Sequence, residues 1–520
     1  MKKAAKLLEL PRLAHNEQGL TASHMHLNRI ARPVAALAIG WILSSSSCVS
    51  YHAEPLHPEQ SERAFNERML GSIALRDQIR RGASPVESEP TTQGSDVSGL
   101  AWDLDSLTRA AILLHRDMEV ARAHLAATRA GRATAGEMPN PSIQFAPEYA
   151  TNPGGITPWI WGFSLDIPIE TAGKRRIRIA QSEALSDAGR MELAETAWHV
   201  RSRLRDALAD FLLTQAESKL WEQEVAGRSA YLNVLDIRLK AGEAGRAELD
   251  IARVDLLTAR QSRLAALGRA EDSRNKLASA IGLPTSGLGD AQFVWPGIDQ
   301  FEPLDRGAAR ALQAAGLLNR MDIRRSLSEY AATEAALHLE IAKQYPDLHF
   351  TPGYLFDQAV NKIQLGLTLA LPILNQNGGA IGEAVAHRAE SGQKFLALQA
   401  QVIAETESAV TRYRSALAEL EDEESQIAQI QRQLEVSQLA LKIGEQDRLA
   451  VSGLEVQHNV ARRLRLDAIR KARAARSAIE DAIERPLPGA LPTTQISPPA
   501  TQPRQPATTQ SSAHRKDSLS

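Results

Sequence analysis

Residues that could carry out chemistry are few and scattered along this chain of 520 residues. A phosphate-binding loop needs an earlier glycine and a Ser or Thr after its lysine, and Gly173-Lys174 has neither. The 13 histidines form no His-Glu-x-x-His motif, and a single cysteine rules out a thiolate zinc cluster within the chain. We therefore expect no catalytic residue, no resident metal and no cofactor, so the chain is not predicted to be an enzyme.

The single cysteine points to chemistry of another kind. Cys48 follows Arg29 and Arg32, an apolar segment at 34–43 and four serines. That segment has the length of a signal-peptide core and is too short to span a membrane. The pattern resembles a bacterial lipoprotein signal, in which the cysteine is acylated and becomes the first residue. We expect residues 1–47 to be the signal region and Cys48 the lipid anchor.

Two details of this signal are unusual. Lipoprotein signals usually carry Leu three residues before the cysteine, where this chain has Ser45. The polar stretch before Met25 is also unlike an export signal, which suggests that translation starts at Met25. An ordinary cleaved signal with an incidental cysteine is the alternative.

The composition favours long helices packed against each other. Aromatic residues make up only 4 % of the chain, whereas compact cores usually contain more of them. The formal net charge is −2, which argues against a nucleic-acid partner, because such a partner requires a basic surface.

The central part of the chain contains an internal duplication. Two proline-flanked segments of alternating apolar residues recur, and the same offset relates glycine-containing stretches further along. The paired positions are Pro141 and Pro346, Gly162 and Gly366, Pro168 and Pro372, Gly242 and Gly444, and Pro284 and Pro486, with offsets of 202 to 205. We expect repeat 1 at 101–290 and repeat 2 at 301–487, each with a helix, two strands, a long helix and a return helix.

The strands of each repeat have the length that a tilted strand needs to cross a bilayer, about ten residues. Apolar residues alternate with small or polar ones in 163–167 and 363–371, which places them on one face. Turns are expected at 152–155 and 356–358.

Long helices should follow each pair of strands. No proline occurs in 173–242 or 378–444. Each interval predicts a helix of roughly 65 residues, about 100 Å long. Shorter helices are predicted around 108–131 and 322–343 from apolar residues at three- and four-residue spacing.

Four membrane strands cannot close a barrel by themselves, and lipid does not tolerate an open sheet edge. Three chains would supply twelve strands, an even number typical of outer-membrane barrels. Outside the repeats, 48–100 is expected to be a loosely ordered periplasmic leader, and 488–520, rich in Pro, Thr, Gln and Ser, a disordered tail.

Three motifs resemble the TolC-like outer-membrane efflux proteins: Pro-Asn-Pro at 139–141, the strand end and Glu-Thr-Ala-Gly-Lys-Arg at 166–175, and Ala-Ile-Gly-Leu-Pro at 280–284. The resemblance covers about 101–487. It implies a mainly α fold with membrane β: a trimeric 12-stranded β-barrel, four strands per chain, continuous with a long α-helical barrel.

The implied function is the outer-membrane channel of a tripartite efflux system. A homotrimer in outer-membrane lipid would passively conduct substrate delivered by an inner-membrane pump, of RND type, and a periplasmic adaptor. The stretch at 169–175 is most similar to members serving heavy-metal exporters, but the substrate, metal ion or drug, stays open.

The resemblance also assigns site residues. Adaptor docking and the closing aperture fall on the helix-to-helix turns, here Gly242, Gly245, Arg246, Glu248, Asp250, Gly444, Glu445, Asp447 and Arg448. The strand-helix junction holds Pro168, Gly173, Lys174, Arg175 and Pro372. Leu441 and Ala450 stand where related gates carry an aromatic residue and an aspartate, so the gate chemistry carries over poorly.

Two other classes remain open. A lipid-anchored periplasmic coiled-coil adaptor or scaffold would explain the helices and the anchor, but it would not need a duplicated pair of membrane-length strands. A helical enzyme is opposed by the absence of catalytic motifs and by the low aromatic content.

Overall fold

The computed structural model describes residues 50–72, 75, 77–78, 101–305 and 307–487. The signal region, Cys48 with its expected acylation, Met25 and the tail at 488–520 lie outside these residues. Contacts divide the chain into two units, 1–61 and 62–520, and the duplicated core lies within the second.

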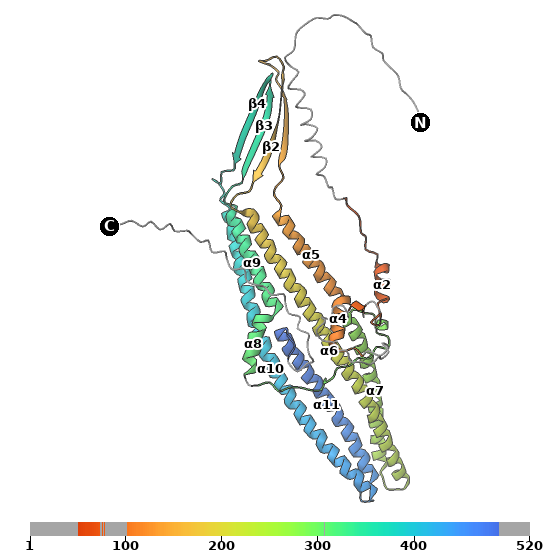
Figure 1. Ribbon diagram of the computed structural model, residues 1–520. Helices are drawn as coiled ribbons and strands as arrows, with labels where there is room; N and C mark the ends of the chain where they lie inside the picture. The colour runs from red at the N-terminus through yellow and green to blue at the C-terminus, as the bar shows by residue number, and fades with distance from the viewer. Residues whose placement is uncertain (1–49, 73–74, 76, 79–100, 306, 488–520) are drawn as a thin grey trace, which may run out of the picture. The chain divides into compact units, whose positions relative to one another are not determined.

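The same order of elements occurs twice (Figure 1). The first set is α4 (Leu104–Leu114), α5 (Arg116–Gly136), β1 (Ser142–Tyr149), β2 (Trp159–Ile169), α6 (Lys174–Lys240) and α7 (Arg246–Ile281). The second is α8 (Ala308–Asn319), α9 (Met321–Ala342), β3 (Leu348–Asp357), β4 (Val360–Leu369), α10 (Gly378–Lys442) and α11 (Arg448–Ile483). A short 3-10 helix, η2 (Thr285–Leu288), follows α7, and α2 (Pro58–Asn66) precedes the core.

Part of the segment expected to be a loosely ordered leader is structured. Within the second unit, Leu70 is fully buried and joins the core of the first repeat. The guanidinium of Arg68 donates to the carbonyl oxygen of Leu114 at 2.7 Å, at the end of α4. The expectation of a loose leader is wrong for these residues, because an apolar side chain and a cap for a helix end hold them on the core.

The helix before each strand pair is interrupted, which the sequence pattern did not predict. His115 separates α4 from α5, and Arg320 separates α8 from α9; both have extended backbone, with ψ of 131° and 135°. His115 stabilises its break because Nδ1 accepts from the Asp117 amide at 3.2 Å. The uninterrupted helix expected over 108–131 is therefore corrected to two helices.

The two long helices, α6 and α10, have 67 and 65 residues, as the proline-free intervals indicated. α6 packs against α5, α7, α9 and α11, so it joins the two repeats. It places Leu204 and Leu208 in the first core cluster and Leu213 in the second. Each fully buried leucine contributes about 1.5–3 kcal/mol. Among the described helices, none is both long and apolar enough to cross a membrane.

The strands form one antiparallel sheet in the order β1-β2-β3-β4, which joins the hairpins of the two repeats. β3 runs to Asp357, and the turn to β4 consists of Gln358 and Ala359, with φ of 50° and 79°. The turn expected at 356–358 is thus displaced by one to two residues. The mainly helical fold with a small antiparallel sheet is confirmed.

Candidate functional site

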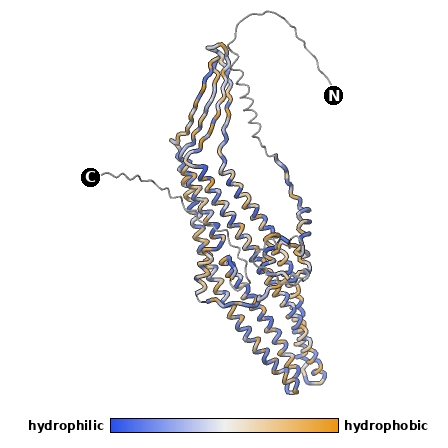
Figure 2. Tube along the Cα trace, viewed as in Figure 1, coloured by the Kyte–Doolittle hydropathy of each residue, from blue (hydrophilic) through white to orange (hydrophobic). Residues whose placement is uncertain are grey.

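One face of the sheet is apolar. The register aligns Phe145 with Phe163, Phe163 with Tyr354, and Tyr354 with Ile363, so these side chains share a face. The apolar face consists of Ile143, Phe145, Pro147, Tyr149, Trp159, Trp161, Phe163, Leu165, Ile167, Ile169, Leu348, Phe350, Pro352, Tyr354, Phe356, Ile363, Leu365, Leu367 and Leu369. On β4, Ile363 and Leu365 are 84 % and 75 % exposed. Figure 2 shows hydrophobic and hydrophilic residues mixed along the strands, as alternating faces require. A contiguous exposed apolar surface of this kind marks contact with a membrane or another protein.

Aromatic rings gather on this face toward the hairpin ends of the strands. The rings of Tyr149 and Trp159 lie 5.1 Å apart, and those of Trp161 and Phe356 lie 5.5 Å apart. The Phe163 and Tyr354 rings are 5.8 Å apart. Such belts are typical of strands at a membrane–water interface.

The opposite face is predominantly polar, although Ile160, Leu355 and Val360 also lie on it. It carries Ser142, Gln144, Glu148, Ser164, Asp166, His349, Thr351, Asp357, Lys362, Gln364 and Thr368. Lys362 pairs with Asp357 at 2.6 Å. The Nδ1 atom of His349 lies 3.1 Å from each carboxylate oxygen of Asp166. This face suits an aqueous pore.

The junction between β2 and α6 is held by the residues predicted for it. Gly173 precedes α6 with φ of 70°, a conformation that favours glycine. The ammonium of buried Lys174 donates to the Tyr345 carbonyl at 2.7 Å and to Asp347 at 2.8 Å. Arg175 donates to the carbonyl oxygen of Gly136 at 2.6 Å. These contacts tie the helix start to both neighbouring helix-to-strand connections.

The rest of this stretch also serves structure. Glu170 pairs with Arg178, and the Thr171 amide donates to Asp347 at 2.8 Å. Pro168 lies in β2 opposite His349, while Pro372 lies between β4 and α10. These residues of the stretch are therefore engaged in holding the joint between β2 and α6.

The helix-to-helix turns have matching geometry in both repeats. Gly242 and Gly444 each have φ of 81°, the left-handed conformation that ends a helix. The Glu243 amide donates back to the Arg238 carbonyl at 2.8 Å, and the Glu445 amide donates to Ala440 at 2.9 Å. Neither glycine Cβ position meets another atom within 4 Å, so the backbone conformation is what selects glycine here.

An ion pair joins the two turns. Arg238, near the end of α6, lies 2.5 Å from Asp447 of the second turn and 3.6 Å from Glu243 of its own. Asp447 also caps α11 by accepting from the Leu449 amide at 3.2 Å. The sequence pattern missed Arg238 because it lies inside the helix. An arginine one turn before the glycine was the available signal.

The other predicted turn residues lie in the turns or at the starts of the helices that follow them. Gly245 precedes α7, while Arg246 and Arg448 begin α7 and α11. These residues, with Glu248, Asp250 and Glu445, are exposed. Asp250 faces Arg253 of its own helix at 3.4 Å. The turns thus present exposed charges of both signs on a tip fixed by Arg238.

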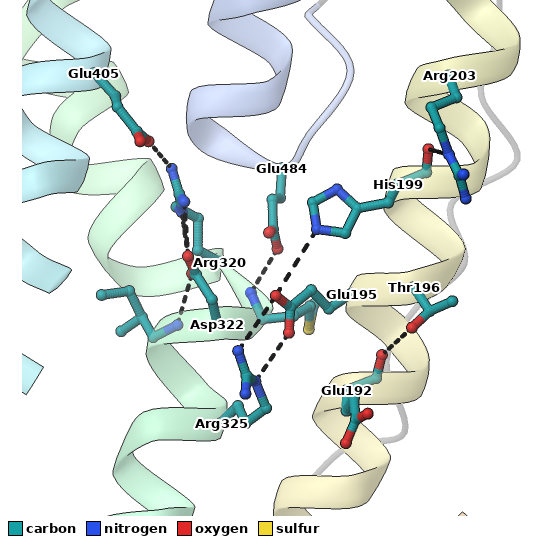
Figure 3. A network of polar contacts seen from close by, with 12 residues as sticks. Glu192, Glu195, Thr196, His199, Arg203, Arg320, Asp322, Arg325, Glu405 and Glu484 are labelled. Atoms are coloured by element: carbon teal, nitrogen blue, oxygen red, sulfur yellow. Dashed lines mark hydrogen bonds and ion pairs between the residues drawn. The ribbon is translucent and has the colours of Figure 1, made fainter. Parts of the chain in front are cut away.

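Away from the tips, a polar network joins α6, α9, α10 and α11 (Figure 3). Arg320 pairs with Asp322 at 2.7 Å and with Glu405 of α10 at 2.8 Å. Glu195 of α6 accepts from Arg325 of α9 at 3.0 Å. The Glu195–Arg325 pair crosses between the repeats, and the Arg320–Glu405 pair ties the start of α9 to α10, so the network links the two long helices.

Glu484 occupies an unusual place in this network. It ends α11 with φ of 47°, where the first repeat has Gly282. Its carboxylate accepts from the Met321 amide at 2.6 Å, which caps α9, since Arg320 cannot accept a hydrogen bond. Burial raises the pKa of Glu484 to about 7, and nearby Asp322 adds to this rise.

No three or more His, Cys, Asp or Glu side chains among the described residues come together in a way that could hold a metal ion. The two-faced sheet and the charged turns are the candidate functional surfaces.

This arrangement of a two-faced sheet and paired long helices is the fold of outer-membrane efflux channels. Residues 107–283 match the model of the family described as "Outer membrane efflux protein". The structure resembles that of the outer-membrane channel OprN, with a TM-score of 0.61 and 18 % identity, over 73 % of this chain and 89 % of that one. For CusC, studied for transmembrane channel formation, the TM-score is 0.60 and the identity 16 %, over 76 % and 95 % of the two chains.

A curated relative is the cobalt-zinc-cadmium resistance protein CzcC of Cupriavidus metallidurans, 24 % identical over 285 residues. The alignment covers 54 % of this chain and 65 % of CzcC, just under two thirds of that protein. These comparisons confirm the resemblance to the TolC-like outer-membrane efflux protein family.

Proposed function

We propose that the chain is the outer-membrane channel subunit of a tripartite efflux system. Three copies would close a 12-stranded barrel continuous with a helical barrel, and substrate would pass through it passively. The channel would be anchored in the outer membrane of a Gram-negative bacterium by acylated Cys48, with a large periplasmic portion.

The observation that carries this proposal is the two-faced sheet. Its apolar face is suited to lipid and its polar face to water. Within the described residues, β1 and β4 each pair on one side only, which leaves two complementary open edges. In a membrane these edges need partners, and β1 of one copy can pair with β4 of the next.

The helices give independent support for assembly. Toward its end, α10 exposes Val436 and Leu439, at 68 % and 63 %, and Ile443, directly after the helix, is 65 % exposed. Along α7, Ile251, Val254, Leu257 and Leu264 are each more than 60 % exposed. Apolar residues repeated along a helix are covered by another helix when a partner is present. Neighbouring copies would cover these surfaces.

The family resemblance supports the remaining partners. A periplasmic adaptor would dock at the turns around Gly242 and Gly444, whose exposed charges offer polar contacts. An inner-membrane pump, of RND type, would deliver the substrate. We propose divalent transition-metal cations as this substrate, because the curated relative is named for resistance to cobalt, zinc and cadmium.

The sheet proposal is tested by two arginine substitutions at neighbouring positions of β4. Leu365→Arg places a charge on the apolar face, at a cost of about 2–4 kcal/mol near the centre of a bilayer. Gln364→Arg places the same charge on the polar face. We expect wild type and Gln364→Arg to form channels in planar bilayers and Leu365→Arg to assemble poorly.

Equal assembly of both variants would contradict membrane burial of the apolar face. A wild-type chain that stays soluble without detergent and conducts nothing would favour the adaptor or scaffold alternative.

A further inference from the structure

His349 is the sole histidine in the four strands, and it lies on the polar face near the end of the sheet that joins the helices. Its side chain is 43 % exposed and that of Asp166 is 34 % exposed. Within the four strands, therefore, only His349 can offer an imidazole to a cargo in the pore.

The Asp166 carboxylate orients this imidazole. Nδ1 of His349 lies 3.1 Å from both carboxylate oxygens, a geometry in which Nδ1–H donates to the pair. A neutral imidazole carries one N–H, so this hydrogen bond leaves the lone pair on Nε2. The same carboxylate–histidine arrangement fixes histidines that bind metals through their other nitrogen.

The surroundings match a weak contact rather than a closed site. His349 of β3 pairs with Thr368 of β4, and most of the apolar residues of the sheet lie on the opposite face. The strands contribute one imidazole per chain, and no cluster of three or more metal-binding side chains occurs in the described parts, so a cation at His349 would meet few ligands. A conduit requires contacts from which the cargo can leave.

We propose that His349, oriented by Asp166, is a low-affinity contact for divalent transition-metal cations as they pass along the polar face of the sheet. The ligand class follows from imidazole, which suits zinc, copper and nickel, whereas magnesium prefers oxygen ligands. This inference rests on the proposed channel function and names a cargo-contacting residue where the sequence predicted no metal site.

The test is single-channel recording of the full-length protein with Zn²⁺ or Mg²⁺ as the added ion. We expect Zn²⁺ to reduce the wild-type current at concentrations where Mg²⁺ does not, and His349→Ala to abolish that difference. Asp166→Asn keeps an acceptor but removes the charge, and should raise the half-blocking Zn²⁺ concentration about 10-fold.

His387→Ala is the matched control, since His387 on α10 also lies between carboxylates, 3.6 Å from Glu383 and 3.5 Å from Glu390. Zn²⁺ should block the His387→Ala channel as it blocks the wild-type channel. Each variant is first checked for an unchanged native mass and for channel formation without Zn²⁺, so that a folding defect is recognised.

Two failures are distinguishable. If wild type forms no channel, the proposed function is wrong. If channels form but Zn²⁺ acts like Mg²⁺, or blocks His349→Ala as it blocks wild type, the channel stands and the role of His349 is wrong.

Discussion

We expect the stability of this protein to depend on pH through Glu484, whose pKa is raised to about 7 by burial. The substitution Glu484→Gln keeps an oxygen that can accept from the Met321 amide, which lies 2.6 Å from the present carboxylate. It removes the charge that the buried network disfavours.

The magnitude follows from the pKa of Glu484, raised by burial from 4.5 to about 7. Because the folded-state value exceeds the unfolded one, the stabilisation is fully present below pH 4.5 and is lost as the pH rises through about 7. At pH 8 this difference in pKa lowers the free energy of unfolding by at most about 3 kcal/mol per chain. For the residues between 101 and 487, with an unfolding entropy of about 2.1 cal/mol/K per residue, this is a shift in Tm of about 4 °C.

The assay is thermal unfolding in detergent, followed by circular dichroism from pH 5 to pH 8. We expect Glu484→Gln and wild type to melt together at pH 5, and the variant to melt several degrees higher at pH 8. Glu445→Gln, in an exposed turn, is the control and should keep the wild-type profile. A difference between Glu484→Gln and wild type that is constant across this pH range would refute the reasoning.

Three further predictions concern buried charge, the tip and the turns. Arg205 is 2 % exposed and pairs with Glu480 and Asp481 at 3.1 and 2.8 Å, so Arg205→Ala should cost about 3–5 kcal/mol in urea unfolding; a cost below 1 kcal/mol would contradict this. Arg238→Gln breaks the pair between the turns and should raise the open-channel fraction in bilayers while changing stability by less than about 1 kcal/mol, whereas Arg253→Gln should change neither. Gly444→Ala should cost about 1 kcal/mol because φ is 81°, while Gly453→Ala, inside α11, should stabilise by a similar amount; the same sign for both would be inconsistent with the turn geometry.

The sequence predicts most of the fold because its signals are local. The lengths of α6 and α10 follow from intervals without proline, and the strand faces follow from alternation with period two. The reversal at Gly242 and Gly444 follows from the need for positive φ at the end of a helix.

Long-range packing limits what the sequence can predict. The breaks at His115 and Arg320 occur in helix-compatible sequence and are set by contacts with other helix ends. The burial of Leu70 depends on a core that includes residues more than 200 positions away, such as Leu277 and Leu288. The Arg238–Asp447 pair joins positions 209 residues apart, so the place of Arg238 one turn before Gly242 does not reveal its partner.

We propose that three copies of this chain build one membrane channel. Native mass spectrometry of the detergent-solubilised, full-length protein tests this assembly most directly. We expect a single species with three times the mass of the mature chain. A monomer that stays monomeric in detergent would contradict it, because the open edges of β1 and β4 would then have no partner.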